Sequence, residues 1–180
     1  MRRVDKLEVM IPEDQIISRV KEVAAEISRD YNGEPVTVIG VLTGAFIFCA
    51  DLVRNLDLPV KIDFVQVSSY VGDTSTGELK IKKDISSDIK GENVLLVEDI
   101  IDTGRTLLKL RQMLSERGPK SIKICTAFDK PSRRVVELVP DYNCFTIPDS
   151  FVVGYGLDYD GEYRQFKDVK IVRIDDEQQP

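Results

Sequence analysis

The stretch Val94–Thr106, VLLVEDIIDTGRT, places an apolar run directly before acidic residues and a small polar turn. An uninterrupted apolar run between polar residues is typical of a strand buried on both faces of a sheet. Farther along, Leu107, Leu110 and Leu114 recur at helical spacing until Gly118-Pro119. The stretch therefore predicts a strand, a turn and a helix in succession, which is the repeating unit of α/β proteins.

The same alternation extends in both directions along the chain. A first helix is predicted from Pro12 to the stop at Asn32-Gly33, and further helices at 45–56 and 103–117. Strands are predicted at 35–42, 60–68, 93–97 and 121–128, with an edge strand at 78–85. From 131 to 174 the sequence is irregular, with short strand candidates at 151–153 and 169–174. This order predicts an α/β fold with a mainly parallel twisted sheet flanked by helices, in one domain.

Composition excludes several classes of function. With 25 basic and 31 acidic residues the chain carries a net charge of −6, which disfavours generic binding to nucleic acid. It has no histidine, so Ser-His-Asp triads, Cys-His dyads and His-ligated zinc are excluded. The three cysteines are too few and too scattered for a disulfide framework or a zinc site, and Cys49 and Cys125, which lie in apolar runs, are expected to be buried thiols in a reducing cytosol. The longest apolar stretch, 41–53, is interrupted by Thr43 and Asp51, so we expect a cytoplasmic protein without a membrane span or signal peptide.

In parallel sheets ligands bind at the carboxyl ends of the strands, so the loops after Leu42, Val97 and Phe128 are the informative ones. In the loop after Val97, backbone N–H groups and the hydroxyls of Thr103 and Thr106 could surround a phosphate at a helix N-terminus. A plain capped turn is the alternative interpretation, because Asp and Thr are good N-caps.

Glu98 and Asp99 favour the ligand interpretation. Adjacent acids at the end of a buried strand are unfavourable unless they face hydroxyls or a cation. The chain has no Walker pattern for a nucleoside triphosphate. Two acids followed by a phosphate loop suit a ligand with ribose hydroxyls and a phosphate.

The residues Val94–Thr106 resemble the phosphoribosyl-pyrophosphate signature of the type I phosphoribosyltransferases, most closely the hypoxanthine(-guanine) phosphoribosyltransferases of purine salvage. Further matching segments, in the order of that family, are 41–44, 68–70, 129–134 and 151–159. The resemblance covers roughly residues 7–166. It implies a single phosphoribosyltransferase domain over 1–180, with a core at about 30–130 and a small irregular hood from the N-terminal segment and about 140–175.

The resemblance also implies roles for the residues that contact phosphoribosyl pyrophosphate. Glu98 and Asp99 would hold the ribose hydroxyls, directly or through Mg²⁺, and Asp158 would bind a second Mg²⁺ with the pyrophosphate. The 5-phosphate would be bound by Thr103, Gly104, Arg105 and Thr106. The pyrophosphate would be bound by Leu42, Thr43, Gly44 and Arg164, often across a cis peptide between Leu42 and Thr43.

For the base, the resemblance implies a catalytic Asp102 that faces purine N7 and manages its proton during attack on the anomeric carbon. Lys130 would donate to the 6-oxo oxygen, and that donation would select hypoxanthine or guanine over adenine. Phe151 would stack on the purine and the Val152 backbone would read the ring edge. Ser69 and Tyr70 would lead into a mobile lid.

The expected reaction joins hypoxanthine, and guanine as well, to phosphoribosyl pyrophosphate, giving IMP or GMP and pyrophosphate with Mg²⁺ as cofactor. Members of this family are usually homodimers or homotetramers, and neither nucleic acid nor membrane is an expected partner. Two alternatives stay open at this point. One is a regulator that keeps the fold and binds RNA or DNA, and the other is a transferase that prefers xanthine.

Overall fold

The large sheet forms the centre of the protein. The computed structural model describes residues 6–69 and 79–173, and six of its strands pair in the order β4-β3-β2-β5-β6-β7. Their bounds are β2 Val36–Leu42, β3 Val60–Ser69, β4 Leu79–Lys83, β5 Asn93–Ile101, β6 Ser121–Asp129 and β7 Tyr142–Thr146. The pairings are parallel except that of β3 with β4 at the edge. The predicted α/β fold with a mainly parallel sheet is confirmed.

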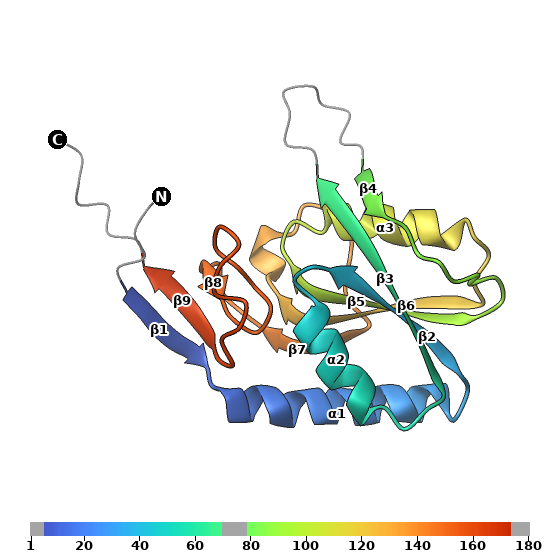
Figure 1. The fold of residues 1–180 in the computed structure, drawn as a ribbon, viewed down its shortest axis with the longest axis horizontal. Coiled ribbons are helices and arrows are strands. Elements are labelled where there is room, and N and C mark those ends of the chain that lie inside the picture. The colour runs from blue at the N-terminus through green and yellow to red at the C-terminus, as the bar shows by residue number, and fades with distance from the viewer. Residues whose placement is uncertain (1–5, 70–78, 174–180) are drawn as a thin grey trace.

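Helices cover both faces of this sheet (Figure 1). Helices α1 (Glu13–Tyr31) and α2 (Phe46–Asn55) pack on one face and α3 (Arg105–Ser115) on the other. In β5, Leu95 and Val97 point into the core under α1 and α2, whereas Val94 and Leu96 point into the core under α3. Because successive residues of a strand face opposite sides, both faces of β5 are apolar, as its sequence predicts.

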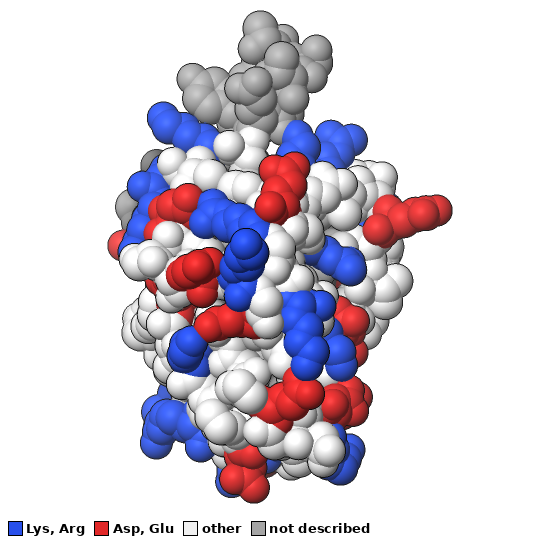
Figure 2. Space-filling view, turned by 90° about the vertical axis from the view of Figure 1, so that its right-hand side faces the viewer, with Lys and Arg blue, Asp and Glu red and all other residues white. Residues whose placement is uncertain are grey.

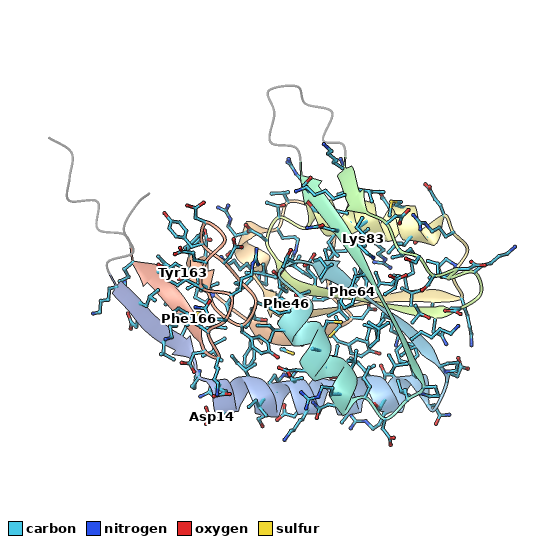
Figure 3. All side chains as sticks on the ribbon, viewed as in Figure 1. Asp14, Phe46, Phe64, Lys83, Tyr163 and Phe166 are labelled. Atoms are coloured by element: carbon cyan, nitrogen blue, oxygen red, sulfur yellow. The ribbon has the colours of Figure 1, made fainter. Side chains whose placement is uncertain are left out.

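Gly40 of β2 allows a close contact between the sheet and its neighbours. A Cβ atom at Gly40 would lie 2.9 Å from the ring of Phe64 and 3.2 Å from the thiol of Cys49 on α2. Phe64 projects from β3 beside α2, whose first residue is Phe46 (Figure 3). Any larger residue at 40 would push this ring and helix away from the strand.

A second, smaller sheet stands beside the large one (Figure 1). Its strands β1 (Lys6–Ile11), β9 (Val169–Arg173) and β8 (Val152–Val153) are antiparallel in the order β1-β9-β8. The chain runs directly from β1 into α1, while β8 and β9 enclose the loop of residues 154–168. The division of the chain into a core and a hood at the boundaries given above stays a prediction.

The structure corrects the predicted elements in four places. Strand β1 was not predicted, because its residues alternate too weakly between buried and exposed. Strand β7 lies in a segment expected to be irregular and joins the edge of the large sheet beside β6. Helix α3 begins at Arg105 because Gly104 is left-handed, with φ 80°. Strand β5 continues to Ile101 through its pairing with β6, so Glu98 and Asp99 lie inside the strand.

Three cysteines, Cys49, Cys125 and Cys144, are free and buried. Within residues 6–69 and 79–173, none of the helices has both the length and the apolar character that crossing a membrane requires.

Candidate functional site

The turn between β5 and α3 has the form of an anion site. Gly104 precedes the first residue of α3 in the left-handed conformation, and its carbonyl accepts a hydrogen bond from the Leu108 N–H at 2.9 Å. A Cβ atom at Gly104 would lie 3.0 Å from Cδ of Arg134, so glycine is favoured by space as well as by φ. The N–H groups of the first helical turn have no acceptor within the helix and can serve an anion. Thr103 and Thr106 are half-buried here and Arg105 is exposed.

The two acids of β5 are half-buried beside each other. The Asp99 N–H donates to Oε1 of Glu98 at 3.0 Å, and the Ile100 N–H donates to Oδ1 of Asp99 at 2.6 Å. Burial, and then the neighbouring charge of Asp99, raise the pKa of Glu98 well above its ordinary value. Burial also raises the pKa of Asp99, although hydrogen bonds and the charge of Arg164 oppose the rise. Across the described ranges, no lysine or arginine forms an ion pair within 4.0 Å of either acid.

The loop after β2 lies directly against this acid pair. A Cβ atom at Gly44 would overlap a carboxylate oxygen of Asp99, and a Cβ atom at Gly156 would overlap the carbonyl oxygen of Gly44. The peptide bond between Leu42 and Thr43 is cis, as the resemblance implies. Glycines at 44 and 156 thus allow segments from β2, β5 and the 154–168 loop to meet at one point.

Arg164 and Asp158 join the same group of segments. Nη2 of Arg164 lies 2.9 Å from Oδ1 of Asp158, and Nη1 donates to the carbonyl of Gly156 at 2.6 Å. The second oxygen of Asp158 accepts from the Gly161 N–H at 2.9 Å. Within the described part of the chain, no three His, Cys, Asp or Glu residues cluster as metal ligands. The predicted metal-binding roles of Glu98, Asp99 and Asp158 stay predictions.

Lys130 and Phe151 lie together on another side of the site. Lys130 is buried, with 8% of its surface exposed, and its ammonium group donates to the Ser150 carbonyl at 2.7 Å. Phe151, which follows Ser150 in the chain, is 50% exposed. The ring of Tyr159 packs edge-on against its ring, with the ring centroids 5.4 Å apart. Val152 is buried in β8. An exposed aromatic face next to a buried ammonium group is the arrangement that a flat heterocycle with a carbonyl oxygen would need.

Asp102 lies at the start of the turn with 46% of its side chain exposed. Nε of Arg133 donates to Oδ1 of Asp102 at 3.1 Å, and Nη1 of Arg133 lies 3.6 Å from Oδ2 of Asp149. Arg134 forms a close, largely buried ion pair with Asp129 and donates to the backbone carbonyl of Asp102 at 3.2 Å. The structure thus brings Asp102 close to two arginines to which sequence reasoning gave no role.

A signal for these arginines is present in the sequence. Arg133 and Arg134 follow the end of β6, and Asp102 follows the end of the neighbouring strand β5. Carboxyl ends of neighbouring parallel strands meet at one edge of a sheet, so opposite charges after two such strands are expected to pair. Of the two residues predicted to lead into the lid, Ser69 ends β3 and Tyr70 lies outside the described residues.

Comparison with known proteins identifies the family of the chain. The family model of the phosphoribosyl transferase domain matches residues 12–160. The chain is 47% identical over 170 residues to the hypoxanthine-guanine phosphoribosyltransferase of Streptococcus pneumoniae strain R6, covering 94% of each chain. It is 47% identical over 174 residues to the hypoxanthine phosphoribosyltransferase of Salmonella typhimurium LT2, covering 94% of this chain and 98% of that one.

A solved structure is similar to this chain over most of its length. The hypoxanthine-guanine phosphoribosyltransferase of Bacillus anthracis superimposes with a TM-score of 0.89 at 46% identity, covering 92% of this chain and 98% of that chain. The chain belongs to the phosphoribosyltransferase family and is an enzyme of the type I fold. Within that family its similar relatives bear the name hypoxanthine or hypoxanthine-guanine phosphoribosyltransferase, which confirms the resemblance seen in the sequence.

Proposed function

We propose that this enzyme transfers the 5-phosphoribosyl group from phosphoribosyl pyrophosphate to hypoxanthine and guanine in purine salvage. The bond between the anomeric carbon and the pyrophosphate oxygen breaks, and a bond from that carbon to the purine nitrogen forms. The products are IMP or GMP and pyrophosphate. One observation supports this most. The Gly44 loop contacts the acid pair of β5 at the carboxyl edge of the large sheet, and Lys130 and Phe151 lie at the same edge.

Each part of the site has a proposed task. The turn from Thr103 to Thr106 holds the 5-phosphate through backbone N–H groups at the start of α3, and Glu98 and Asp99 face the ribose hydroxyls. The loop of Leu42, Thr43 and Gly44 holds the leaving pyrophosphate, helped by Arg164. Asp102 accepts the proton at purine N7 as the base attacks, a task that falls to a carboxylate in a chain without histidine. This arrangement fixes the reacting atoms relative to each other, which lowers the entropic cost of the reaction.

Magnesium is the proposed cofactor, held by Glu98 and Asp99 at one site and by Asp158 at another. The residues fit the ion, because they offer carboxylate oxygens and the acid pair of β5 is half-buried with raised pKa values and no cationic partner among the described residues. Bound Mg²⁺ would neutralise charge on the pyrophosphate as it leaves. Substrate oxygens and water would supply the remaining ligands, which is usual for Mg²⁺ at phosphate sites.

Lys130 is the proposed reader of the base. Its ammonium group has three N–H donors, of which one is directed to Ser150, so donors remain for the 6-oxo oxygen of hypoxanthine or guanine. Adenine presents an amino group at that position, which cannot accept a hydrogen bond from an ammonium group. Phe151 stacks on the base, and the Val152 backbone reads the ring edge.

A direct assay tests this proposal. Purified protein with Mg²⁺ and phosphoribosyl pyrophosphate is expected to convert hypoxanthine and guanine with a far higher kcat/KM than adenine. Comparing hypoxanthine, guanine and xanthine on the same preparation decides whether the xanthine alternative holds. Absence of turnover with all of these bases would refute the proposed function, and salt-sensitive RNA or DNA binding without turnover would support the regulator instead.

The role of Lys130 has its own test. Lys130→Met should lower kcat/KM for hypoxanthine by about 10- to 100-fold, the effect of losing a hydrogen bond from a charged donor. The KM for phosphoribosyl pyrophosphate should change little. Lys123→Met is a suitable control, because Lys123 lies on β6 before Lys130 and pairs with Asp30 away from the site. Equal losses for both substrates would contradict a role in base reading.

We further propose a homodimer or homotetramer in the cytoplasm, formed by a single phosphoribosyltransferase domain. The free, buried thiols of the three cysteines suit a reducing compartment. Light scattering of the purified protein tests the oligomeric state.

A further inference from the structure

Arg133 contacts two carboxylates that belong to different walls of the proposed base site. Its Nε donates to Oδ1 of Asp102 at the end of β5, and its Nη1 lies 3.6 Å from Oδ2 of Asp149. Asp149 immediately precedes Ser150, which accepts the hydrogen bond from Lys130, and Phe151 follows. One guanidinium group therefore bridges the carboxylate that faces purine N7 and the segment that covers the purine face.

The backbone around Arg133 is fixed on both sides. The Lys130 N–H donates to the Ile101 carbonyl at 3.0 Å, and Pro131–Arg133 forms a short 3-10 helix. On the other side, the Val135 N–H donates to the Thr103 carbonyl at 3.1 Å. The Arg133 side chain is thus held by a short segment that is attached to the Asp102 turn both before and after it.

The two carboxylate oxygens of Asp102 differ in their hydrogen bonds. Oδ1 accepts the hydrogen bond from Arg133, whereas no hydrogen bond to Oδ2 is found among the described residues. A carboxylate with one oxygen held by a donor has its plane fixed and its other oxygen available. That is the state in which Asp102 can accept a proton from a base without first changing its rotamer.

Stability alone does not account for Arg133. Its side chain is 49% exposed and Asp102 and Asp149 are 46% and 53% exposed, and ion pairs this exposed contribute little to the free energy of unfolding. We propose that Arg133 is a positioning residue of the transfer reaction. It orients the Asp102 carboxylate toward the purine and sets the distance between Asp102 and the Asp149–Phe151 segment. This inference rests on the proposed function of the same site.

The test compares three variants with the wild type in steady-state kinetics for both substrates. Arg133→Met removes the charge and keeps the aliphatic length, and we expect kcat/KM for hypoxanthine to fall about tenfold, less than the loss from removing a proton-transfer group. The KM for phosphoribosyl pyrophosphate should stay within twofold. Arg133→Lys keeps the charge but has one nitrogen, whereas the bridge to Asp102 and Asp149 uses two. Its kcat/KM for hypoxanthine should therefore fall about threefold, half of the Arg133→Met loss on a logarithmic scale.

Asp149→Asn tests the bridge itself. Alone, it should lower kcat/KM for hypoxanthine by about threefold, and combined with Arg133→Met it should add nothing, because residues that act as one unit are not additive. Arg173→Met is the matched control, since it removes an exposed arginine that pairs with Glu8 at 3.1 Å on the small sheet. It should leave both substrates unaffected.

The outcomes separate this inference from the proposed function. If wild-type protein converts no 6-oxopurine, the proposed function fails. If the wild type is active and Arg133→Met stays within twofold of it, or loses as much toward phosphoribosyl pyrophosphate as toward hypoxanthine, only the positioning role of Arg133 is overturned. Full additivity of Arg133→Met with Asp149→Asn would likewise overturn the bridge.

Discussion

Glu92 directly precedes strand β5 and Glu98 lies in the second half of that strand, and the two carboxylates have different surroundings. Glu92 precedes β5 and has partners: Lys61 forms a close ion pair with it, and the Thr37 hydroxyl donates to it. These two contacts lower the pKa of Glu92, the lysine most. Among the described residues, the Glu98 carboxylate accepts a hydrogen bond from the N–H of its neighbour Asp99 alone, and burial raises the pKa of Glu98.

A second acid at the amino edge is paired as well. At the amino edge, Glu34 pairs with Lys120 at 2.6 Å and accepts from Asn93 at 2.8 Å. Figure 2, which faces the side of the molecule where α1 ends and β2 begins, shows acidic and basic side chains interspersed. At the carboxyl edge, Glu98 and Asp99 face a glycine loop. Acidic side chains that are paired with a cation or a hydrogen-bond donor stabilise the fold. Acidic side chains without a counterion remain able to bind a ligand or a metal ion.

The largest effect that this comparison predicts is on catalysis. Asp102→Asn should lower kcat by about 100-fold or more, the usual effect of removing a group that transfers a proton. Stability should hardly change, because the side chain is 46% exposed. Asp84→Asn is a matched control, since Asp84 is also 46% exposed and pairs with an arginine, Arg117, at 2.8 Å.

Steady-state rates and urea midpoints of both variants provide the measurement. The control should keep full activity. An Asp102→Asn enzyme with near wild-type kcat would remove Asp102 from the proton transfer and leave it as a cap of the turn.

The sequence predicts the part of the fold that depends on local pattern. The buried strands, the three helices and the strand–turn–helix unit at Val94–Thr106 follow from apolar periodicity and turn residues, and the structure confirms them. Strands β1 and β7 were missed because each is short and lies at a sheet edge, where pairing with a distant partner decides the conformation.

The candidate site divides in the same way. Residues inside a recognisable segment, such as Glu98, Asp99 and Lys130, could be predicted because the segment itself marks them. The contact of Arg133 with Asp102 and Asp149, and that of Gly156 with Gly44, could not be predicted, because they join segments far apart in the chain. Such contacts depend on how the 129–135 segment and the 154–168 loop fold over the sheet edge.

A smaller effect is predicted for substrate binding. Glu98→Gln should raise the KM for phosphoribosyl pyrophosphate about tenfold, since a charged contact to hydroxyls or metal is worth about 1.5 kcal/mol or more. Glu92→Gln, at the other end of the strand, should leave both KM values unchanged. Equal KM values in Glu98→Gln and wild type would place the ribose contact on Asp99 alone.

The smallest effect predicted is on the free energy of unfolding, and its sign differs between Glu92 and Glu98. Glu92 has a lowered pKa in the folded state, so it stabilises the fold above its ordinary value of 4.5 and loses this contribution as the pH falls through the folded value. Glu92→Gln should therefore cost about 1 kcal/mol at pH 7 and less below pH about 4.

Glu98 should behave in the opposite way, because its folded pKa is raised. Between pH 4.5 and the raised pKa, Glu98 is protonated in the folded protein and ionised in the unfolded chain. The loss of folding stability caused by the buried charge therefore disappears as the pH falls from the raised pKa toward 4.5. Glu98→Gln should accordingly stabilise the protein at pH 7 and be neutral near pH 4.5. Urea unfolding of both variants across this range, without Mg²⁺ or substrate, measures how the change in free energy of unfolding depends on pH, which gives one slope for each variant. Slopes of the same sign would mean that Glu98 has a counterion in the unliganded protein, and the distinction between Glu92 and Glu98 would fail.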